Sequence, residues 1–249
     1  MSKAIQSTSS SKSERMHPLD NIIWKALTTR QAQFAESFGT ARRFVRDVGP
    51  LAAAEQCGDE GYASLAGLLS NGATVGVFLN DPYEPRPGWE FVAGAPLLQM
   101  VSENGTRSSS NGHVKIEQLD DKDSPEMLEL TALTKPGPFG TRTHELGYYI
   151  GIRDAGKLVA MAGERLKVPG HTEISAVCTH PDHLGKGYAG VLMNEVMRVI
   201  RTRNEIPFLH VRADNTRAIG LYERLGFRIR WSGHFAVLRK IGETDSATL

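Results

Sequence analysis

The chain has 249 residues, of which 40% are hydrophobic and 23% are charged, and its formal net charge is +1 at pH 7. This balance is typical of a folded globular protein and argues against a nucleic acid or an anionic membrane as partner. The two cysteines, Cys57 and Cys178, provide neither a disulfide framework nor a paired-cysteine metal site, so we expect a reducing, cytoplasmic environment. No apolar run is long enough to cross a bilayer.

The N-terminal half is expected to form an additional α/β region over residues 16–112, preceded by a Ser- and Lys-rich tail, 1–15, with the composition of a disordered segment. Apolar residues at three- and four-residue spacings between Ile22 and Phe38 predict a helix, and GYASLAGLLSNG predicts a second one. Two strands are expected at TVGVFL and LLQMV, with a proline-rich loop between them. The polar stretch 102–112 has the composition of a linker.

The C-terminal half, residues 113–249, alternates short strands with helices. HVKIEQL predicts a strand, and DSPEMLELTALT predicts a helix that begins at Ser124 and Pro125. YYIGIRD and KLVAMAGERL are expected to pair as a hairpin, followed by the strand EISAVCT. A long amphipathic helix from Tyr188, the strand PFLHVRA, a helix capped by Asn215 and a final hairpin, FRIRW with HFAVLRK, complete the chain. The expected fold class is α/β, with a mixed, mainly antiparallel sheet flanked by helices.

A glycine motif follows the strand EISAVCT. Gly185–Gly190, GKGYAG, has the spacing G-x-G-x-x-G found in dinucleotide-binding turns. Five residues separate the strand from the motif, and too little chain follows for a doubly wound sheet, which argues against a nicotinamide cofactor. The motif can instead expose backbone N–H groups at the start of a helix, where the helix dipole favours a pyrophosphate. An NADP-dependent oxidoreductase stays an alternative, because Arg212 could accept a 2′-phosphate.

A second motif lies downstream, at residues 215–227, where NTRAIGLYERLGF has the pattern N-x-x-A-x-x-L-Y-x-x-x-G-F. Together with the strand ending AVCTHP and the turn HLGKGYA, this motif makes residues 113–249 resemble the GNAT superfamily of acyl-coenzyme A-dependent N-acyltransferases. The N-terminal half is similar to that of a two-part subgroup whose acetyltransferase half is C-terminal. The resemblance implies acetyl transfer from acetyl-coenzyme A to a primary amine, on a small molecule or a peptide, by direct attack in a ternary complex.

The resemblance also implies a coenzyme site. Backbone N–H groups of the turn would bind the pyrophosphate, at Leu184, Gly185, Lys186, Gly187, Tyr188 and Ala189. Free backbone groups of Val177, Cys178 and Thr179 would pair with pantetheine, and one such N–H would polarise the acetyl carbonyl. Asn215 matches the family asparagine that contacts pantetheine. Asp182 and Leu184 stand where the family usually has cationic or amide side chains, so one phosphate contact is missing.

Three residues are candidates for catalysis. Tyr222 matches the family tyrosine that protonates the leaving thiolate, and the alternative is a tyrosine of the core. Glu173 lies where some family members carry a basic glutamate, and Glu164 lies on the preceding strand; the alternative for both is a solvated carboxylate at a strand end. The loop 131–147 is where the family usually shapes acceptor specificity. The candidate acceptor-binding residues in it are Phe139, Thr141, Arg142 and His144.

A histidine pair and a cysteine could also carry chemistry, as a metal site and as an acyl carrier. His180 and His183 form H-x-x-H, but no further local ligands accompany them, so we expect no metal. Cys178 is expected to be a buried strand thiol rather than an acyl carrier, because direct transfer needs no covalent enzyme intermediate. A non-catalytic acyl-coenzyme A sensor is the remaining alternative function.

Overall fold

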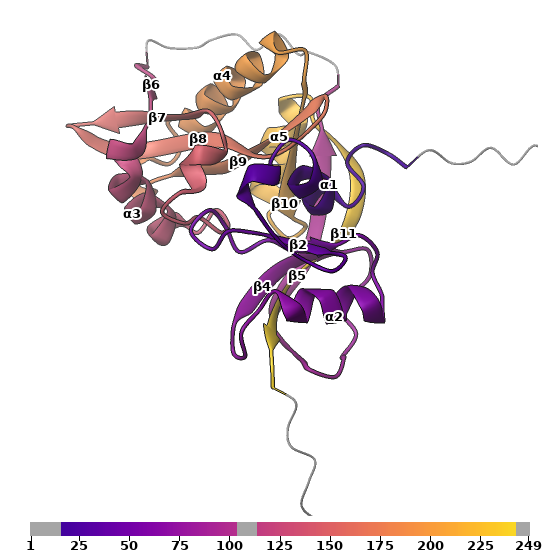
Figure 1. Ribbon diagram of the computed structural model, residues 1–249. Helices are drawn as coiled ribbons and strands as arrows, with labels where there is room; N and C mark the ends of the chain where they lie inside the picture. Colours follow the sequence, from indigo (N-terminus) through magenta and orange to yellow (C-terminus); the bar gives the residue numbers. More distant parts are fainter. Residues whose placement is uncertain (1–15, 104–113, 243–249) are drawn as a thin grey trace, which may run out of the picture.

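The computed structural model describes residues 16–103 and 114–242, which form an eight-stranded sheet, a small three-stranded sheet and the helices that cover them (Figure 1). The strands of the large sheet are β4 (Thr74–Leu79), β5 (Trp89–Val101), β6 (Glu117–Gln118), β7 (Tyr149–Asp154), β8 (Lys157–Val168), β9 (His171–Thr179), β10 (Ile206–Arg212) and β11 (Arg228–Lys240). The small sheet contains β1 (Ala35–Phe38), β2 (Ala41–Phe44) and β3 (Ala52–Ala54). The helices are α1 (Ile22–Thr28), α2 (Asp59–Gly67), α3 (Ser124–Thr134), α4 (Tyr188–Thr202) and α5 (Thr216–Arg224). Short 3-10 turns lie at Ala32–Phe34, Asp121–Asp123, Thr143–Leu146 and Pro181–His183.

Most elements occur where the sequence predicts them. The strand expected at HVKIEQL is limited to β6, Glu117–Gln118, and two further elements differ. The helix expected between Ile22 and Phe38 ends at Thr28, and Phe38 belongs to β1. The expected final hairpin is one continuous strand, β11, with a bulge between Ile229 and Trp231. Its two halves pair with the same neighbour, so no turn is needed. The expected tail, 1–15, and most of the expected linker lie outside the described residues.

The strand β5 links the two halves of the chain. The sheet order is β4-β11-β5-β10-β9-β8-β7-β6, so β5 lies between β10 and β11, and it is antiparallel to both. The N-terminal half therefore contributes β4 and β5 to a sheet that it shares with the C-terminal half. In Figure 1 these two strands and β11 extend toward the lower end of the molecule. A division between residues 112 and 113 does not separate two sheets.

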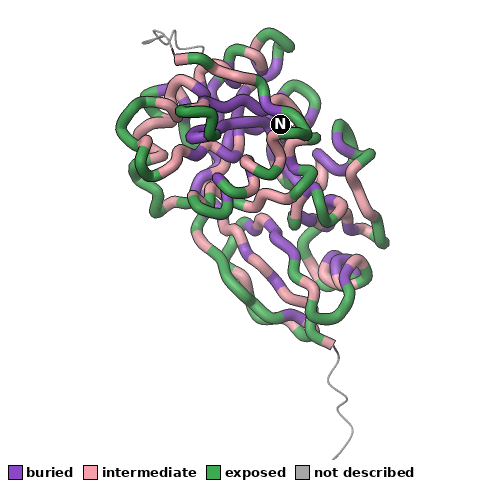
Figure 2. Tube along the Cα trace, turned by 90° about the vertical axis from the view of Figure 1, so that its left-hand side faces the viewer, coloured by how far each residue is buried: buried purple, intermediate pink, exposed green. Residues whose placement is uncertain are grey.

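Helices α4 and α5 cover one face of the large sheet. Val196 and Ile200 of α4 are fully buried, and they share a core cluster with Ile174 of β9 and Leu209 of β10. The apolar stripe of α4 therefore packs on the large sheet, as expected for an amphipathic surface helix. Figure 2 shows buried residues gathered in the interior of the fold and exposed residues mostly along its outer edge.

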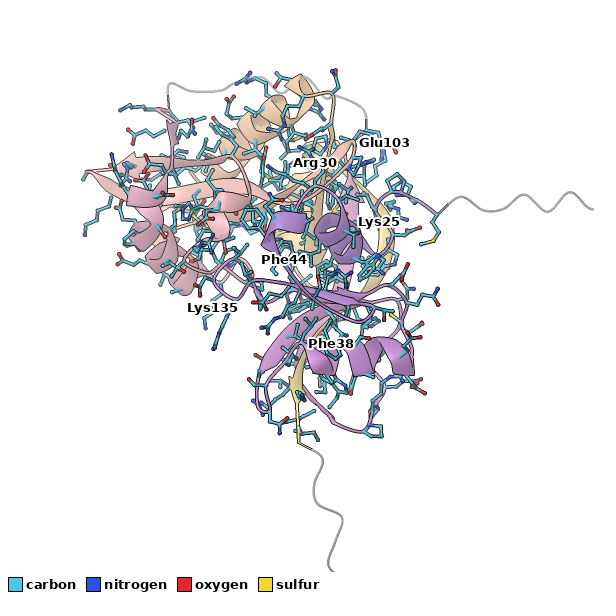
Figure 3. All side chains as sticks on the ribbon, viewed as in Figure 1. Lys25, Arg30, Phe38, Phe44, Glu103 and Lys135 are labelled. Atoms are coloured by element: carbon cyan, nitrogen blue, oxygen red, sulfur yellow. The ribbon has the colours of Figure 1, made fainter. Side chains whose placement is uncertain are left out.

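The opposite face is covered by α1 and α3. Ile23 of α1 packs in one cluster with Leu166 of β8 and Phe208 of β10. Phe44 of β2, which Figure 3 labels, belongs to the same cluster. Helix α3 packs over Tyr149 of β7 within a separate cluster. Both sides of the sheet centre are therefore shielded from water. Within the ranges 16–103 and 114–242, no helix combines the length and apolarity that a membrane span requires.

The central place of β5 leads to a first prediction. Met100 has no exposed surface and packs in the cluster under α4, whereas Val92 of the same strand is 40% exposed. Met100→Ala should lower the free energy of unfolding by about 2–5 kcal/mol, through lost burial and a residual cavity. Val92→Ala, the matched control, should stay within about 0.5 kcal/mol of wild type. Denaturant unfolding checks both, and equal effects would show that β5 is not a core strand.

Candidate active site

The sheet opens between two of its central strands. β9 and β10 are parallel and pair only through Ile206 with His171, Pro207 with Thr172 and Phe208 with Glu173. Beyond these three pairs both strands continue, β9 to Thr179 and β10 to Arg212, without hydrogen-bonding each other. The backbone edges that face each other across this gap can therefore accept an extended ligand.

The backbone of β9 is irregular at this gap. Ala176 has φ of 52°, and the pairing of β9 with β8 shifts by one residue next to it, as in a β-bulge. Farther along, the N–H of His180 donates to the carbonyl of Val159 at 2.7 Å. Because N–H groups alternate in direction along a strand, the N–H of Thr179 faces the gap and that of Cys178 faces β8. Of the strand residues expected to contact pantetheine, Thr179 is thus oriented for it and Cys178 is not.

The glycine turn lies between the end of β9 and the start of α4. Gly185 and Gly187 have φ of 81° and 78°, a region that favours glycine, and a Cβ on either would meet open space. Gly187 caps α4 without a side-chain hydrogen bond, so the first-turn N–H groups, from Tyr188 and Ala189 onward, point outward unpaired. The turn has the geometry of an anion-binding helix N-terminus.

Two neighbours modify this turn. The N–H of Leu184 donates to the carbonyl of Pro181 at 3.2 Å, so Leu184 is not one of the available backbone donors. Lys186 Nζ lies 3.1 Å from Nδ1 of His183, whose ring in turn stacks on Tyr188. The ammonium group also lies 5.9 Å from the centroid of the Tyr188 ring, so it stays near the first residue of α4.

Helix α5 borders the same region. The Asn215 side chain accepts from the N–H of Ala218 at 3.1 Å, which confirms Asn215 as the N-cap and leaves its amide N–H₂ free to donate. A Cβ on Gly190 of α4 would lie 3.8 Å from the side chain of Leu221 of α5, so the N-terminal turn of α4 approaches the middle of α5. The two sequence motifs are therefore neighbours in the fold.

Tyr222 packs against the same core cluster as Val177 of β9 and Tyr188 of α4. Its ring meets Phe227 edge-on, with 6.1 Å between centroids. Burial raises the pKa of the phenol to about 12, so it stays protonated at neutral pH. Its hydroxyl has no hydrogen-bond partner among the described residues, and the proton is available to a ligand.

Glu173 has partners that leave it no role as a base. Its carboxylate receives two hydrogen bonds from Arg165, at 2.7 and 2.8 Å, one from the N–H of Leu166 and one from His210 Nδ1 at 2.6 Å. Burial alone would raise its pKa, but Arg165 and His210 outweigh this and lower it to about 2. Glu173, one of the two candidate general bases, is therefore poorly suited to that role, because so weak a base takes no proton from an ammonium group. It is not the solvated carboxylate of the alternative either, since its side chain is fully buried. Sequence reasoning missed Arg165 and His210, although polar residues inside apolar strands were a usable signal.

Glu164 is likewise occupied. One oxygen lies 2.5 Å from Arg203 Nη2, and the other lies 2.7 Å from Lys167 Nζ and accepts from the N–H of Tyr148. The side chain has only 1% of its surface exposed. The structure therefore argues against this candidate too, since each oxygen of the buried carboxylate is already paired with a cation.

The expected acceptor loop lies on the α3 side of the sheet. Phe139 packs against a cluster that includes Tyr149, Ala176 and Cys178, which places it over the diverging half of β9. Arg142 forms a two-pronged ion pair with Glu145, at 2.6 and 2.7 Å.

The other two loop residues have contacts with the first residue of α3 and with the 3-10 turn that precedes this helix. Ser124 donates to the carbonyl of Thr141, and His144 Nε2 lies 2.7 Å from an oxygen of Asp121. Of the four loop candidates, only Phe139 packs against a core cluster that includes residues of β9.

Cys178 and the His180–His183 pair, the other two features singled out in the sequence, are held in contacts within the fold. Burial raises the pKa of the Cys178 thiol to about 11, too high for a reactive thiolate. His180 accepts from the N–H of Asp182, and its ring lies edge-on to that of His183.

A cavity of about 490 Å³ lies on β5 and β11, and its walls include Tyr83, Trp89, Phe91 and His234. None of the residues predicted from the sequence lines it.

The buried ion pair leads to a prediction about acid stability. Glu173→Gln leaves the Arg165 guanidinium without its counter-charge and should cost about 3–5 kcal/mol of unfolding free energy at neutral pH. Because the pKa of Glu173 falls from 4.5 to about 2 on folding, its stabilisation is complete above 4.5 and is lost as the pH falls through 2. The difference between the two proteins should therefore shrink over that range.

The matched control is Glu195→Gln, which breaks the exposed pair with Arg198 and should cost about 1 kcal/mol at most. Chemical unfolding at several pH values measures both variants. Equal costs at neutral pH, or a Glu173→Gln deficit that persists unchanged near pH 2, would contradict the assignment.

Comparison with known proteins agrees with this geometry. The FR47-like protein family matches residues 149–236. The chain is 33% identical over 84 residues to N-alpha-acetyltransferase RimI of Mycobacterium tuberculosis, covering 32% of this chain and 52% of that protein. It is also 28% identical over 209 residues to an uncharacterised protein of Mycobacterium leprae, covering 74% of this chain and 56% of that protein. The chain thus spans about half the length of these curated relatives.

Solved structures extend the likeness to nearly the whole chain. A GCN5-related N-acetyltransferase from Kribbella flavida has 15% identity and a TM-score of 0.57, covering 90% of this chain and 94% of that chain, and shows the same fold. A structure assigned to the GNAT family of acetyltransferases, from Novosphingobium aromaticivorans, is 38% identical with a TM-score of 0.84, covering 91% of this chain and 100% of that one. From these relationships, the chain belongs to the GNAT family of acetyltransferases.

Proposed function

We propose that the protein transfers an acetyl group from acetyl-coenzyme A to a primary amine. The observation that carries this proposal is the gap between β9 and β10, which opens beside a glycine turn at the N-terminus of α4. The gap offers backbone groups to an extended amide chain, and the turn offers N–H groups to an anion. Coenzyme A joins these two chemistries in one molecule, since its pyrophosphate continues into pantetheine.

The coenzyme is proposed to lie across both motifs. Its pyrophosphate binds the N–H groups of Gly185 to Ala189, with Lys186 as the nearby cation. Pantetheine extends into the gap, where Thr179 faces it from β9 and the free amide of Asn215 from α5. The thioester then lies between the diverging strands, close to the irregular backbone at Ala176.

The reaction follows from what these groups can do. The amine nitrogen attacks the acetyl carbon and the carbon–sulfur bond breaks. A backbone N–H in the gap stabilises the negative charge on the carbonyl oxygen. Tyr222 gives its proton to the departing thiolate, because its hydroxyl is unpaired and protonated at neutral pH. Before the attack, water takes the proton that the ammonium loses, since Glu173 and Glu164 are both held in ion pairs. The second proton, which the nitrogen loses as the amide forms, returns through water to the Tyr222 phenolate and restores its hydroxyl.

The acceptor is proposed to be an amine on a peptide or a small molecule. The similarity to a relative named as an N-alpha-acetyltransferase supports testing peptide N-termini first. Free thiol released from acetyl-coenzyme A, measured across a panel of peptides and small amines, tests the function. Stable coenzyme binding with no thiol release from any acceptor would instead support a non-catalytic sensor.

The coenzyme site is tested by Gly187→Val. Acetyl-coenzyme A should raise the melting temperature of the wild type, because a ligand of the native state opposes unfolding. The variant should lose most of this shift, since the new side chain fills the open space where the pyrophosphate would approach.

Gly72→Val is the matched control for the strain of the substitution. Gly72 has φ of 80° and the same open surroundings, but it lies far from the turn in the chain. This variant should lose stability as Gly187→Val does and keep the full ligand shift. Calorimetric binding as tight in Gly187→Val as in wild type would overturn the phosphate assignment.

The role of Tyr222 is tested by Tyr222→Phe, which deletes only the hydroxyl. We expect kcat to fall on the order of 10²-fold, with little change in KM for acetyl-coenzyme A, because the lost interaction belongs to the transition state. The melting temperature should hold, since the hydroxyl has no partner in the described chain. Tyr148→Phe, which alters another tyrosine packed on the same cluster, should leave kcat near wild type. A normal kcat with a lowered melting temperature would identify Tyr222 as a core residue only.

A further inference from the structure

We propose that His210 and Glu173 form the closed end of the acyl-binding gap and restrict transfer to short acyl groups. This inference rests on the proposed function, because it assumes that the thioester lies between β9 and β10. Neither residue reacts. Together they would act as a wall that determines how far an acyl chain can extend.

The wall stands where the two strands separate. Glu173 belongs to the last hydrogen-bonded pair between β9 and β10, opposite Phe208. His210 lies two residues beyond that pair on β10, yet its Nδ1 reaches back to Glu173 Oε1 at 2.6 Å. A side-chain hydrogen bond thus crosses from strand to strand just where the backbone ladder stops.

The His210 ring has no room to move aside. Its side chain is 2% exposed. Phe78 of β4 lies 4.6 Å away and Phe208 lies 5.8 Å away, measured between ring centroids. Two aromatic rings therefore confine the imidazole, while Arg165 holds the carboxylate of Glu173 through two hydrogen bonds.

The hydrogen-bond network also fixes the ring's protons. Arg230 donates to Gln99 Oε1 at 2.7 Å, which turns the Gln99 amide nitrogen toward His210 Nε2, 3.1 Å away. An amide nitrogen only donates, so His210 Nε2 accepts and Nδ1 carries the hydrogen given to Glu173. Burial lowers the pKa of His210, in agreement with a neutral ring. Both ring nitrogens of His210 are therefore engaged in hydrogen bonds. No lone pair is left to take a proton from an incoming amine, so His210 is not a catalytic base in this arrangement.

A wall at this point bears on acyl length. Coenzyme A would enter from the glycine turn, so its acyl end would point toward the place where β9 and β10 converge. A close-packed wall cannot absorb additional methylene groups without displacing its own atoms. One methylene in such a pocket changes specificity by about 10- to 200-fold. The acetyl group is then preferred because longer chains meet the imidazole.

The experiment compares kcat/KM for acetyl- and butyryl-coenzyme A with one amine acceptor. His210→Ala should raise the butyryl-to-acetyl ratio by about 10-fold or more, because the ring's volume becomes available. His210→Gln should keep a ratio close to wild type, since its amide can still donate to Glu173 and fills much of the space. His234→Ala, a histidine on β11 that lines the separate cavity, is the control for removing an imidazole and should not change the ratio.

Melting curves separate folding from specificity. If His210→Ala does not fold, His210→Asn opens part of the same space while keeping a donor, and it should shift the ratio in the same direction. If a folded His210→Ala or His210→Asn variant keeps a butyryl-to-acetyl ratio within about threefold of wild type, His210 does not limit acyl length and the proposal is wrong. Failure of the proposed function itself looks different, because the wild type would then release no thiol from either acyl-coenzyme A.

Discussion

Beyond Phe208 and Glu173, β9 and β10 no longer share hydrogen bonds, although both continue as strands near the middle of the sheet. Each buried backbone group left without a partner costs about 1–3 kcal/mol, so a sheet rarely opens without compensation. Here the helices α4 and α5 cover one side and α1 and α3 the other, which keeps the strands in place. The same unpaired groups are what allow an extended amide ligand to complete the sheet.

Charged groups hold the strands together at the point before they diverge. Glu205, just before β10, accepts from Thr172 of β9 at 2.6 Å and pairs with Arg203. Arg30, from the N-terminal half and labelled in Figure 3, pairs with the same carboxylate. Glu173 and its partners form a second cluster one residue farther along β9. The gap between β9 and β10 is therefore open at one end. At the other end the strands are held together by hydrogen bonds and ion pairs, one of which comes from Arg30 of the N-terminal half.

Local sequence signals predicted the helices and the turn around the candidate site, whereas contacts between distant residues were not predicted. The turn at Gly185–Gly190, the cap at Asn215 and the helices after them depend on residues close in sequence, and the structure confirms these elements. Glu173 was misassigned because its partner Arg165 lies on a neighbouring strand, a pairing that only the fold reveals. The central position of β5 was equally unpredictable, since a strand's sequence indicates burial but not which strands lie beside it.

The position of β5 also has a consequence for how the chain is made. Trp89, at the start of β5, pairs with Lys240, and Val101, at its end, pairs with Phe208 and Arg228. During synthesis this strand leaves the ribosome long before either neighbour exists. Pairing between distant segments is slow, and unpaired strand edges favour aggregation. Exposed apolar residues such as Phe91 add to that risk. The nascent chain thus cannot close its central sheet until β11 has been translated, and its folding depends on the interval before this strand arrives.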